Sequence, residues 1–137
     1  MRILLVEDSD ILADLFRVHL QRLGQHSLSV AASKQKTFEV FKPDAFDIIF
    51  IDMGLEGIPD RGLEIIREIR IQSPQQKIGV LSSNDLQDMV QQSRQVGAAF
   101  YMVKPFTMEG LQVVLEGDEA AMRAYQPDVG EGRIIPL

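Results

Sequence analysis

Short apolar runs alternate along the chain with longer segments in which apolar residues recur at helical spacing. Such runs are typical of strands that are covered on both faces of a sheet. Five of them occur, at Arg2–Val6, Leu28–Ala32, Asp47–Ile51, Lys77–Leu81 and Ala98–Val103. The pattern therefore predicts five strands, most of them buried.

The segments between the runs carry the signals of helices. In the first segment, Ser9 or Asp10 can cap the N-terminus, and Gly24 is a C-terminal stop. In the fourth, Asn84 and Gln87 resemble a capping pair. The pattern predicts helices from Ser9 to Gly24, over Lys34–Phe41, from Gly62 to Pro74, from Asn84 to Gly97 and from Thr107 to about Tyr125.

Strands that alternate with helices through short connections predict an α/β fold. Right-handed crossovers then give a five-stranded parallel sheet with helices on both faces, a three-layer sandwich. We expect this domain to span residues 1–125. Residues 126–137 contain two Pro and two Gly and are interpreted as a C-terminal tail or linker stub. We expect the apolar Ile134, Ile135 and Leu137 to bury surface on their own domain or on a neighbouring chain.

Charge and composition narrow the class of partner. The chain has 14 Lys and Arg against 20 Asp and Glu, a net charge of −6, so direct nucleic-acid binding is not expected. Absence of Cys excludes disulfide and thiolate chemistry. No signal-peptide pattern or membrane-length apolar run is present, and we expect a cytoplasmic protein that does not bind membranes.

Four of the apolar runs end in polar residues of the kind that handle phosphate. Because parallel strands end at one edge of a sheet, these residues should meet there. A carboxylate can accept a phosphoryl group, other acidic groups can hold the divalent cation that the transfer requires, and a lysine and a hydroxyl can bind phosphoryl oxygens. The residues concerned are Glu7 and Asp8 after the first strand, Asp52 after the third, Ser82 after the fourth and Lys104 after the fifth.

These residues, with Tyr101 three positions before Lys104 and the sequence Lys104-Pro105-Phe106, resemble the receiver domain of two-component response regulators from Met1 to about residue 120. The resemblance implies that Asp52 is the phosphoacceptor. It implies that Mg²⁺ is held by Asp8 directly, by Glu7 through water, by Asp52 and by the backbone carbonyl of Gly54. It also implies that Lys104 and Ser82 bind the phosphoryl group, that Ser82 and Tyr101 form a switch pair, and that the Lys104–Pro105 bond is cis.

The same resemblance implies a flavodoxin-like (βα)5 fold with strand order 2-1-3-4-5. The donor would be a histidine kinase or a histidine phosphotransfer protein, and the chain would catalyse only its own phosphorylation and dephosphorylation rather than act as an enzyme. The phosphoryl group would remodel the face formed by the fourth helix, fifth strand and fifth helix. That face would bind a downstream target protein, an output domain or a second copy of the chain.

One loop departs from the pattern of the family. Receivers usually have Met-Pro or Leu-Pro after the phosphoacceptor and a helix-starting Gly about eight residues on; here Leu55 is followed by Glu56, and Gly62 lies ten residues after Asp52. This departure keeps open an alternative, a pseudo-receiver that binds partners without phosphorylation. A phosphatase-like enzyme is less favoured, because such enzymes pair the nucleophile with an Asp two residues on, where this chain has Gly54.

Overall fold

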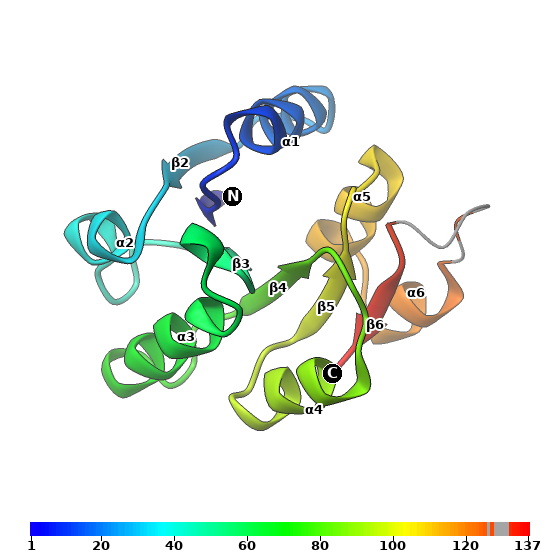
Figure 1. The fold of residues 1–137 in the computed structure, drawn as a ribbon. Helices are drawn as coiled ribbons and strands as arrows, with labels where there is room; N and C mark the ends of the chain where they lie inside the picture. Colours follow the sequence, from blue (N-terminus) through cyan, green and yellow to red (C-terminus); the bar gives the residue numbers. More distant parts are fainter. Residues whose placement is uncertain (126, 128–131) are drawn as a thin grey trace.

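The computed structural model describes residues 1–125, 127 and 132–137 (Figure 1). Its strands are β1 (Arg2–Val6), β2 (Ser27–Ala31), β3 (Ile48–Asp52), β4 (Ile78–Ser82), β5 (Phe100–Val103) and β6 (Ile134–Pro136). Its α-helices are α1 (Asp10–Arg22), α2 (Lys34–Val40), α3 (Arg61–Gln72), α4 (Gln87–Gln95), α5 (Met108–Glu116) and α6 (Glu119–Ala124), with a 3-10 turn η1 at Leu55–Gly57. The predicted alternation of strands and helices is confirmed.

The strands form one sheet in the order β2-β1-β3-β4-β5-β6. The first five strands pair in parallel, which confirms the predicted order and the α/β class. The sheet differs from the predicted five strands because β6 adds to the free edge of β5 in antiparallel orientation. Figure 1 shows β6 beside β5, with α6 close by.

Each face of the sheet buries its own apolar layer. Alternate residues of a strand point to opposite faces, so Ile49 and Ile51 pack under α3 while Ile48 and Phe50 pack under α1. The layer on the α1 side also includes α5 and α6, and the layer on the α3 side includes parts of α2 and α4. This three-layer packing explains why the central strands are apolar along their whole length.

The last predicted helix is two helices. α5 ends at Glu116, Gly117 has extended backbone, and the side chain of Asp118 caps α6 by accepting the N–H of Ala121. A Cβ at Gly117 would lie 2.6 Å from the carbonyl oxygen of Val113, so this break requires glycine. The poor helix propensity of glycine and the capping tendency of aspartate together account for the difference.

The apolar residues of the C-terminal segment pack on their own domain, which is one of the two expected locations; the other is a neighbouring chain. Ile134 is only 4% exposed and joins the layer on the α1 side, whereas Ile135 and Leu137 pack against the opposite layer. The remainder of the predicted tail, residues 126 and 128–131, lies outside the described residues. None of the described helices combines the length and the apolar character that crossing a bilayer requires.

Candidate functional site

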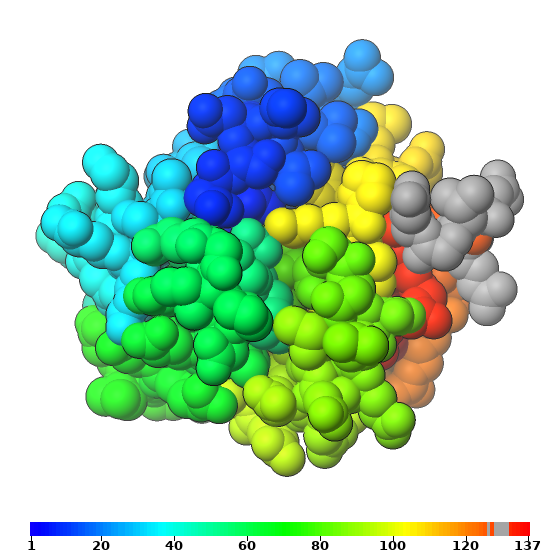
Figure 2. All heavy atoms as spheres, in the orientation of Figure 1, coloured from blue at the N-terminus to red at the C-terminus, as the bar shows by residue number. Residues whose placement is uncertain are grey.

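The C-terminal ends of four parallel strands bring the predicted polar residues to one edge of the sheet. Glu7 follows β1, Asp52 and Ser82 are the last residues of β3 and β4, and Lys104 follows β5. The backbone N–H of Lys104 donates to the carbonyl oxygen of Ser82 at 2.7 Å, which joins the ends of β4 and β5. In Figure 2, atoms from the start of the chain, from around residue 55 and from around residue 105 adjoin on the visible face.

Lys104 occupies the centre of this edge. Its Nζ lies 2.7 Å from Glu7 Oε1 and 2.9 Å from Asp52 Oδ1. The side chains of Lys104, Glu7 and Asp52 are 13%, 1% and 9% exposed, so the three charges interact with little screening by water. Burial lowers the pKa of Lys104, but the two carboxylates outweigh burial and the net pKa is raised. The ammonium group is therefore held in its charged form.

Glu7, Asp8 and Asp52 form an acidic cluster whose carboxylate oxygens lie within 4.8 Å of one another. Burial, reinforced by the charge of Asp52, raises the pKa of Glu7 although Lys104 opposes the shift. Three carboxylates face one ammonium group, and buried Glu7 Oε1 makes no hydrogen bond of good geometry despite its ion pair. An excess of oxygen ligands with negative charge is the donor set that a hard divalent cation such as Mg²⁺ requires.

The long loop after β3 folds against this cluster. The N–H of Gly54 donates to Asp52 Oδ1 at 3.2 Å, and the carbonyl oxygen of Gly54, a predicted metal ligand, accepts the N–H of Gly57 at 3.1 Å. At the end of the loop, Gly62 packs on the backbone of Asp52: a Cβ there would lie 2.6 Å from the carbonyl oxygen. The extra length of the loop thus forms η1, while its end stays in close contact with β3.

Glu56, which the sequence does not mark as a site residue, connects the loop to Asp8 and α2. Its backbone is in the left-handed region, with φ of 60°, where a non-glycine residue is strained. Its N–H donates to Asp8 Oδ2 at 3.2 Å, and its Oε1 accepts the N–H of Lys34 at 2.7 Å. The only sequence signal for this contact is the length of the loop.

Ser82 and Tyr101 are both buried. Their hydroxyl groups form hydrogen bonds with the backbone of the same residue, Asn84 in the loop from β4 to α4. The Ser82 hydroxyl accepts the N–H of Asn84 at 3.4 Å, and the Tyr101 hydroxyl donates to the carbonyl oxygen of Asn84 at 2.6 Å. Burial is the main cause of a raised pKa for Tyr101. The tyrosine ring therefore lies inward, under the loop that begins at Ser82. The Lys104–Pro105 bond is cis, as the resemblance implies.

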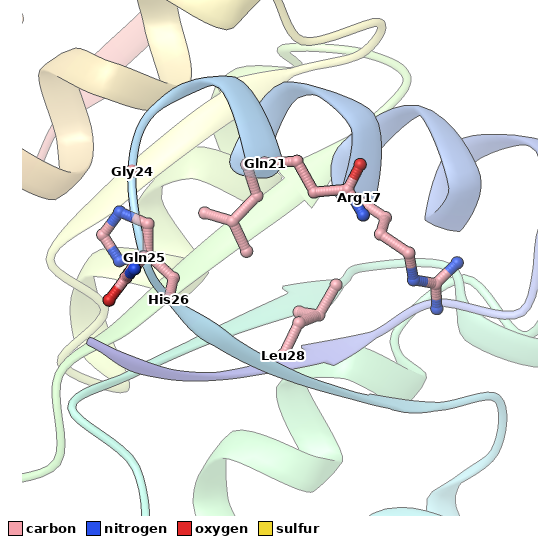
Figure 3. A pocket seen from close by; sticks show the side chains of 7 residues that line it. Arg17, Gln21, Gly24, Gln25, His26 and Leu28 are labelled. Atoms are coloured by element: carbon pink, nitrogen blue, oxygen red, sulfur yellow. The ribbon is translucent and has the colours of Figure 1, made fainter.

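A cavity of about 380 Å³ lies away from this edge, between the end of α1 and the start of β2 (Figure 3). Arg17, Gln21 and His26 line it, but Arg17 pairs with Asp14 at 2.8 Å. Because α1 starts at the Asp52 edge and runs antiparallel to the strands, its C-terminal end reaches the opposite edge of the sheet. The cavity is thus remote from the acidic cluster.

The fold and the polar residues at the C-terminal ends of the strands are those of a receiver domain. The chain belongs to the response regulator receiver family, whose family model matches residues 3–116. The chain is a receiver domain of two-component signalling.

Among characterised relatives, it is 31% identical over 112 residues to the alginate biosynthesis transcriptional regulatory protein AlgB of Pseudomonas syringae pv. tomato, covering 82% of this chain and 24% of AlgB. It is 30% identical over 119 residues to the aerobic respiration control sensor protein ArcB of Escherichia coli, covering 85% of this chain and 15% of ArcB. The chain therefore spans about a quarter or less of the length of these two relatives.

Solved structures show the same fold. A response regulator from Thermotoga maritima has a TM-score of 0.74 and 28% identity, with coverage of 84% of this chain and 93% of that one. The chemotaxis protein CheY4 of Vibrio cholerae has a TM-score of 0.75 and 26% identity, with coverage of 84% and 95%.

Proposed function

We propose that the chain accepts a phosphoryl group on Asp52 from the phosphohistidine of a histidine kinase or a histidine phosphotransfer protein, with Mg²⁺ bound. The observation that carries the proposal is the position of Lys104 Nζ between Asp52 and Glu7, with the carboxylate of Asp8 alongside. A charged lysine at a buried carboxylate can neutralise an incoming phosphoryl oxygen. The surplus negative charge of the cluster supports a divalent cation at the same place.

Asp52 Oδ1 accepts bonds from Lys104 and from the N–H of Gly54, so we assign the attack to Asp52 Oδ2. Oδ2 forms the new P–O bond while the P–N bond to the donor imidazole breaks, and the imidazole nitrogen keeps the electron pair. Lys104 and the Ser82 hydroxyl then each bind one phosphoryl oxygen. Bound Mg²⁺, held by Asp8 and Asp52 with Glu7 acting through water and the Gly54 carbonyl, would offset charge between acceptor and donor.

The output follows from the added charge. The phosphoryl group carries about two negative charges in place of the single charge of the Asp52 carboxylate, a net gain of about one, and draws the Ser82 hydroxyl toward it. Tyr101, which bonds the same loop, follows and remodels the face made by α4, β5 and α5. We assign that face to a downstream target, an output domain or a second copy of the chain, and we place the protein in the cytoplasm.

Incubation with Mg²⁺ and acetyl phosphate, followed by intact-mass measurement, tests the proposal. We expect one added phosphoryl group on the wild type and none on Asp52→Asn. Asp60→Asn is the matched control, because it changes a carboxylate in the loop after β3 whose side chain makes no capping bond to α3. This variant should label like the wild type. Equal labelling of the wild type and Asp52→Asn would refute the assignment.

The pseudo-receiver is the second candidate, and the η1 loop favours it. The N–H of Glu56 already occupies Asp8 Oδ2, so a cation at Asp8 has to bind the other oxygen, Oδ1, or share Oδ2 with this N–H. If the wild type takes up no phosphoryl group at saturating Mg²⁺, the chain acts through partner binding alone. The same mass measurement therefore separates the two candidates.

A further inference from the structure

In a five-stranded sheet β5 would be an edge strand with one unpaired side. Here that side of β5 is paired with β6 of the same chain. Tyr101 pairs with Ile135 and Met102 with Ile134 in an antiparallel register, and Ile134 is buried. Edge strands offer unpaired N–H and C=O groups to which an extended segment can add. β6 thus occupies a surface that can accept a strand (Figure 1).

The two residues before β6 contact both loops that carry phosphoryl-binding groups in the proposed function. The N–H of Gly132 donates to Val103 O and the N–H of Val103 donates to Arg133 O, each at 2.9 Å, directly before Lys104. The guanidinium of Arg133 pairs with Asp85, which lies three residues after Ser82. The start of the C-terminal segment therefore bridges the β4–α4 loop and the end of β5.

Tyr101 provides a second connection between the same parts. Its backbone pairs with Ile135 of β6, and its hydroxyl donates to the carbonyl oxygen of Asn84 in the β4–α4 loop. A displacement of this loop consequently acts on β6 by two routes, the Arg133–Asp85 ion pair and the Tyr101 side chain.

We infer that the β5 edge is a strand-docking surface, filled by residues 132–137 of the same chain, and that phosphorylation of Asp52 weakens this docking. The inference rests on the proposed function. Ser82 directly precedes the β4–α4 loop, so we expect its approach to a phosphoryl group to carry Asp85 away from Arg133. Linkage is reciprocal: the factor by which phosphorylation weakens the docking of β6 is the factor by which loss of the Arg133–Asp85 pair favours the phosphorylated state. Since both side chains are about half exposed, that factor is about two- to fivefold.

Amide hydrogen exchange with and without Mg²⁺ and acetyl phosphate tests this coupling, with labelling confirmed by mass. The reporters are the amides of Val103 and Leu137, whose N–H groups donate to Arg133 O and Ala99 O across the β5–β6 edge. We expect phosphorylation to speed their exchange about two- to fivefold, the factor set by the Arg133–Asp85 pair. Amides of the β1–β2 pairing serve as internal reference and should change little.

Variants supply the reciprocal measurement. Arg133→Ala should raise the phosphorylated fraction at subsaturating acetyl phosphate about two- to fivefold, and Asp85→Ala should match it, with no further gain in the double variant. Arg123→Ala removes another solvent-exposed ion pair, with Glu119 on α6, and should behave like the wild type.

The outcomes separate this inference from the proposed function. A wild type that labels while the Val103 and Leu137 amides keep their protection overturns the inference alone. An Arg133→Ala variant that labels like the wild type does the same. A wild type that takes up no phosphoryl group overturns the proposed function and this inference with it.

Discussion

Replacing Lys104 by Met tests the electrostatics of the site directly, because Met keeps most of the volume and removes the charge. Glu7 and Asp52 would then face each other without a cation. Breaking a buried ion pair by removing one partner costs about 3–5 kcal/mol. For a chain of this length, about 3 °C of melting temperature corresponds to 1 kcal/mol, so we expect a fall of about 10–15 °C at pH 7.

The loss should depend on pH in a direction that Glu7 determines. The folded-state pKa of Glu7 is already raised, so its stabilising contribution is present below its unfolded pKa and is lost as pH rises through the folded value. Without Lys104 the folded value moves higher still, and the penalty extends toward neutral pH. The difference in stability between Lys104→Met and the wild type should therefore shrink on going from pH 7 to pH 5.

Thermal or urea unfolding followed by circular dichroism measures both effects, with Lys42→Met as the control for loss of an exposed lysine. Millimolar Mg²⁺ should raise the melting temperature of Lys104→Met more than that of the wild type, because the cation replaces the missing charge. A Lys104→Met variant as stable as the wild type at pH 7, or a deficit that is independent of both pH and Mg²⁺, would refute the reasoning.

Three further predictions follow from single contacts. Gly79→Ala should cost about 1–3 kcal/mol in denaturant unfolding, because a Cβ there overlaps the ring of Phe100, and Phe100→Leu should restore part of the loss. Glu56→Gly should strengthen Mg²⁺ binding, because it removes the side-chain bond to α2 and loosens the loop whose N–H occupies Asp8 Oδ2, whereas Glu56→Gln, which keeps the acceptor for α2, should bind like the wild type in a calorimetric titration. Burial, and secondarily the charge of Arg22, lowers the pKa of His19 in the folded state. As pH falls, the unfolded state therefore binds this proton before the folded state does, and wild-type stability should fall relative to that of His19→Gln between about pH 7.5 and 5.5.

The parallel strands and the helices between them could be predicted because each leaves a pattern in a short stretch of neighbouring residues. Each central strand is an apolar run that ends in a polar residue, and the direction shared by parallel strands then brings Glu7, Asp52, Ser82 and Lys104 to one edge. The roles of these residues come from the family resemblance and stay predictions. Their proximity alone is a property of the structure.

The features that escaped prediction depend on contacts between distant segments. β6 is three residues long and ends in Pro136, so its strand character comes from pairing with β5 rather than from its own pattern. Glu56 adopts a positive φ that its residue type disfavours, held by a bond to an amide 22 positions earlier in the chain. Neither contact leaves a periodic signal in the sequence.

The charge balance at the sheet edge connects stability with the proposed function. Lys104 neutralises part of the cluster and leaves a surplus of carboxylate charge among Glu7, Asp8 and Asp52, which costs folding free energy in the absence of a cation. A residue set selected for stability alone would lose one of these carboxylates, and Asp52→Asn should therefore unfold at a higher temperature than the wild type without Mg²⁺. The surplus that destabilises the cation-free domain is the same charge that would bind Mg²⁺, so the advantage of Asp52→Asn should diminish as Mg²⁺ is added. If Asp52→Asn is no more stable than the wild type at any Mg²⁺ concentration, the carboxylates do not repel one another and the cluster is already neutralised by Lys104.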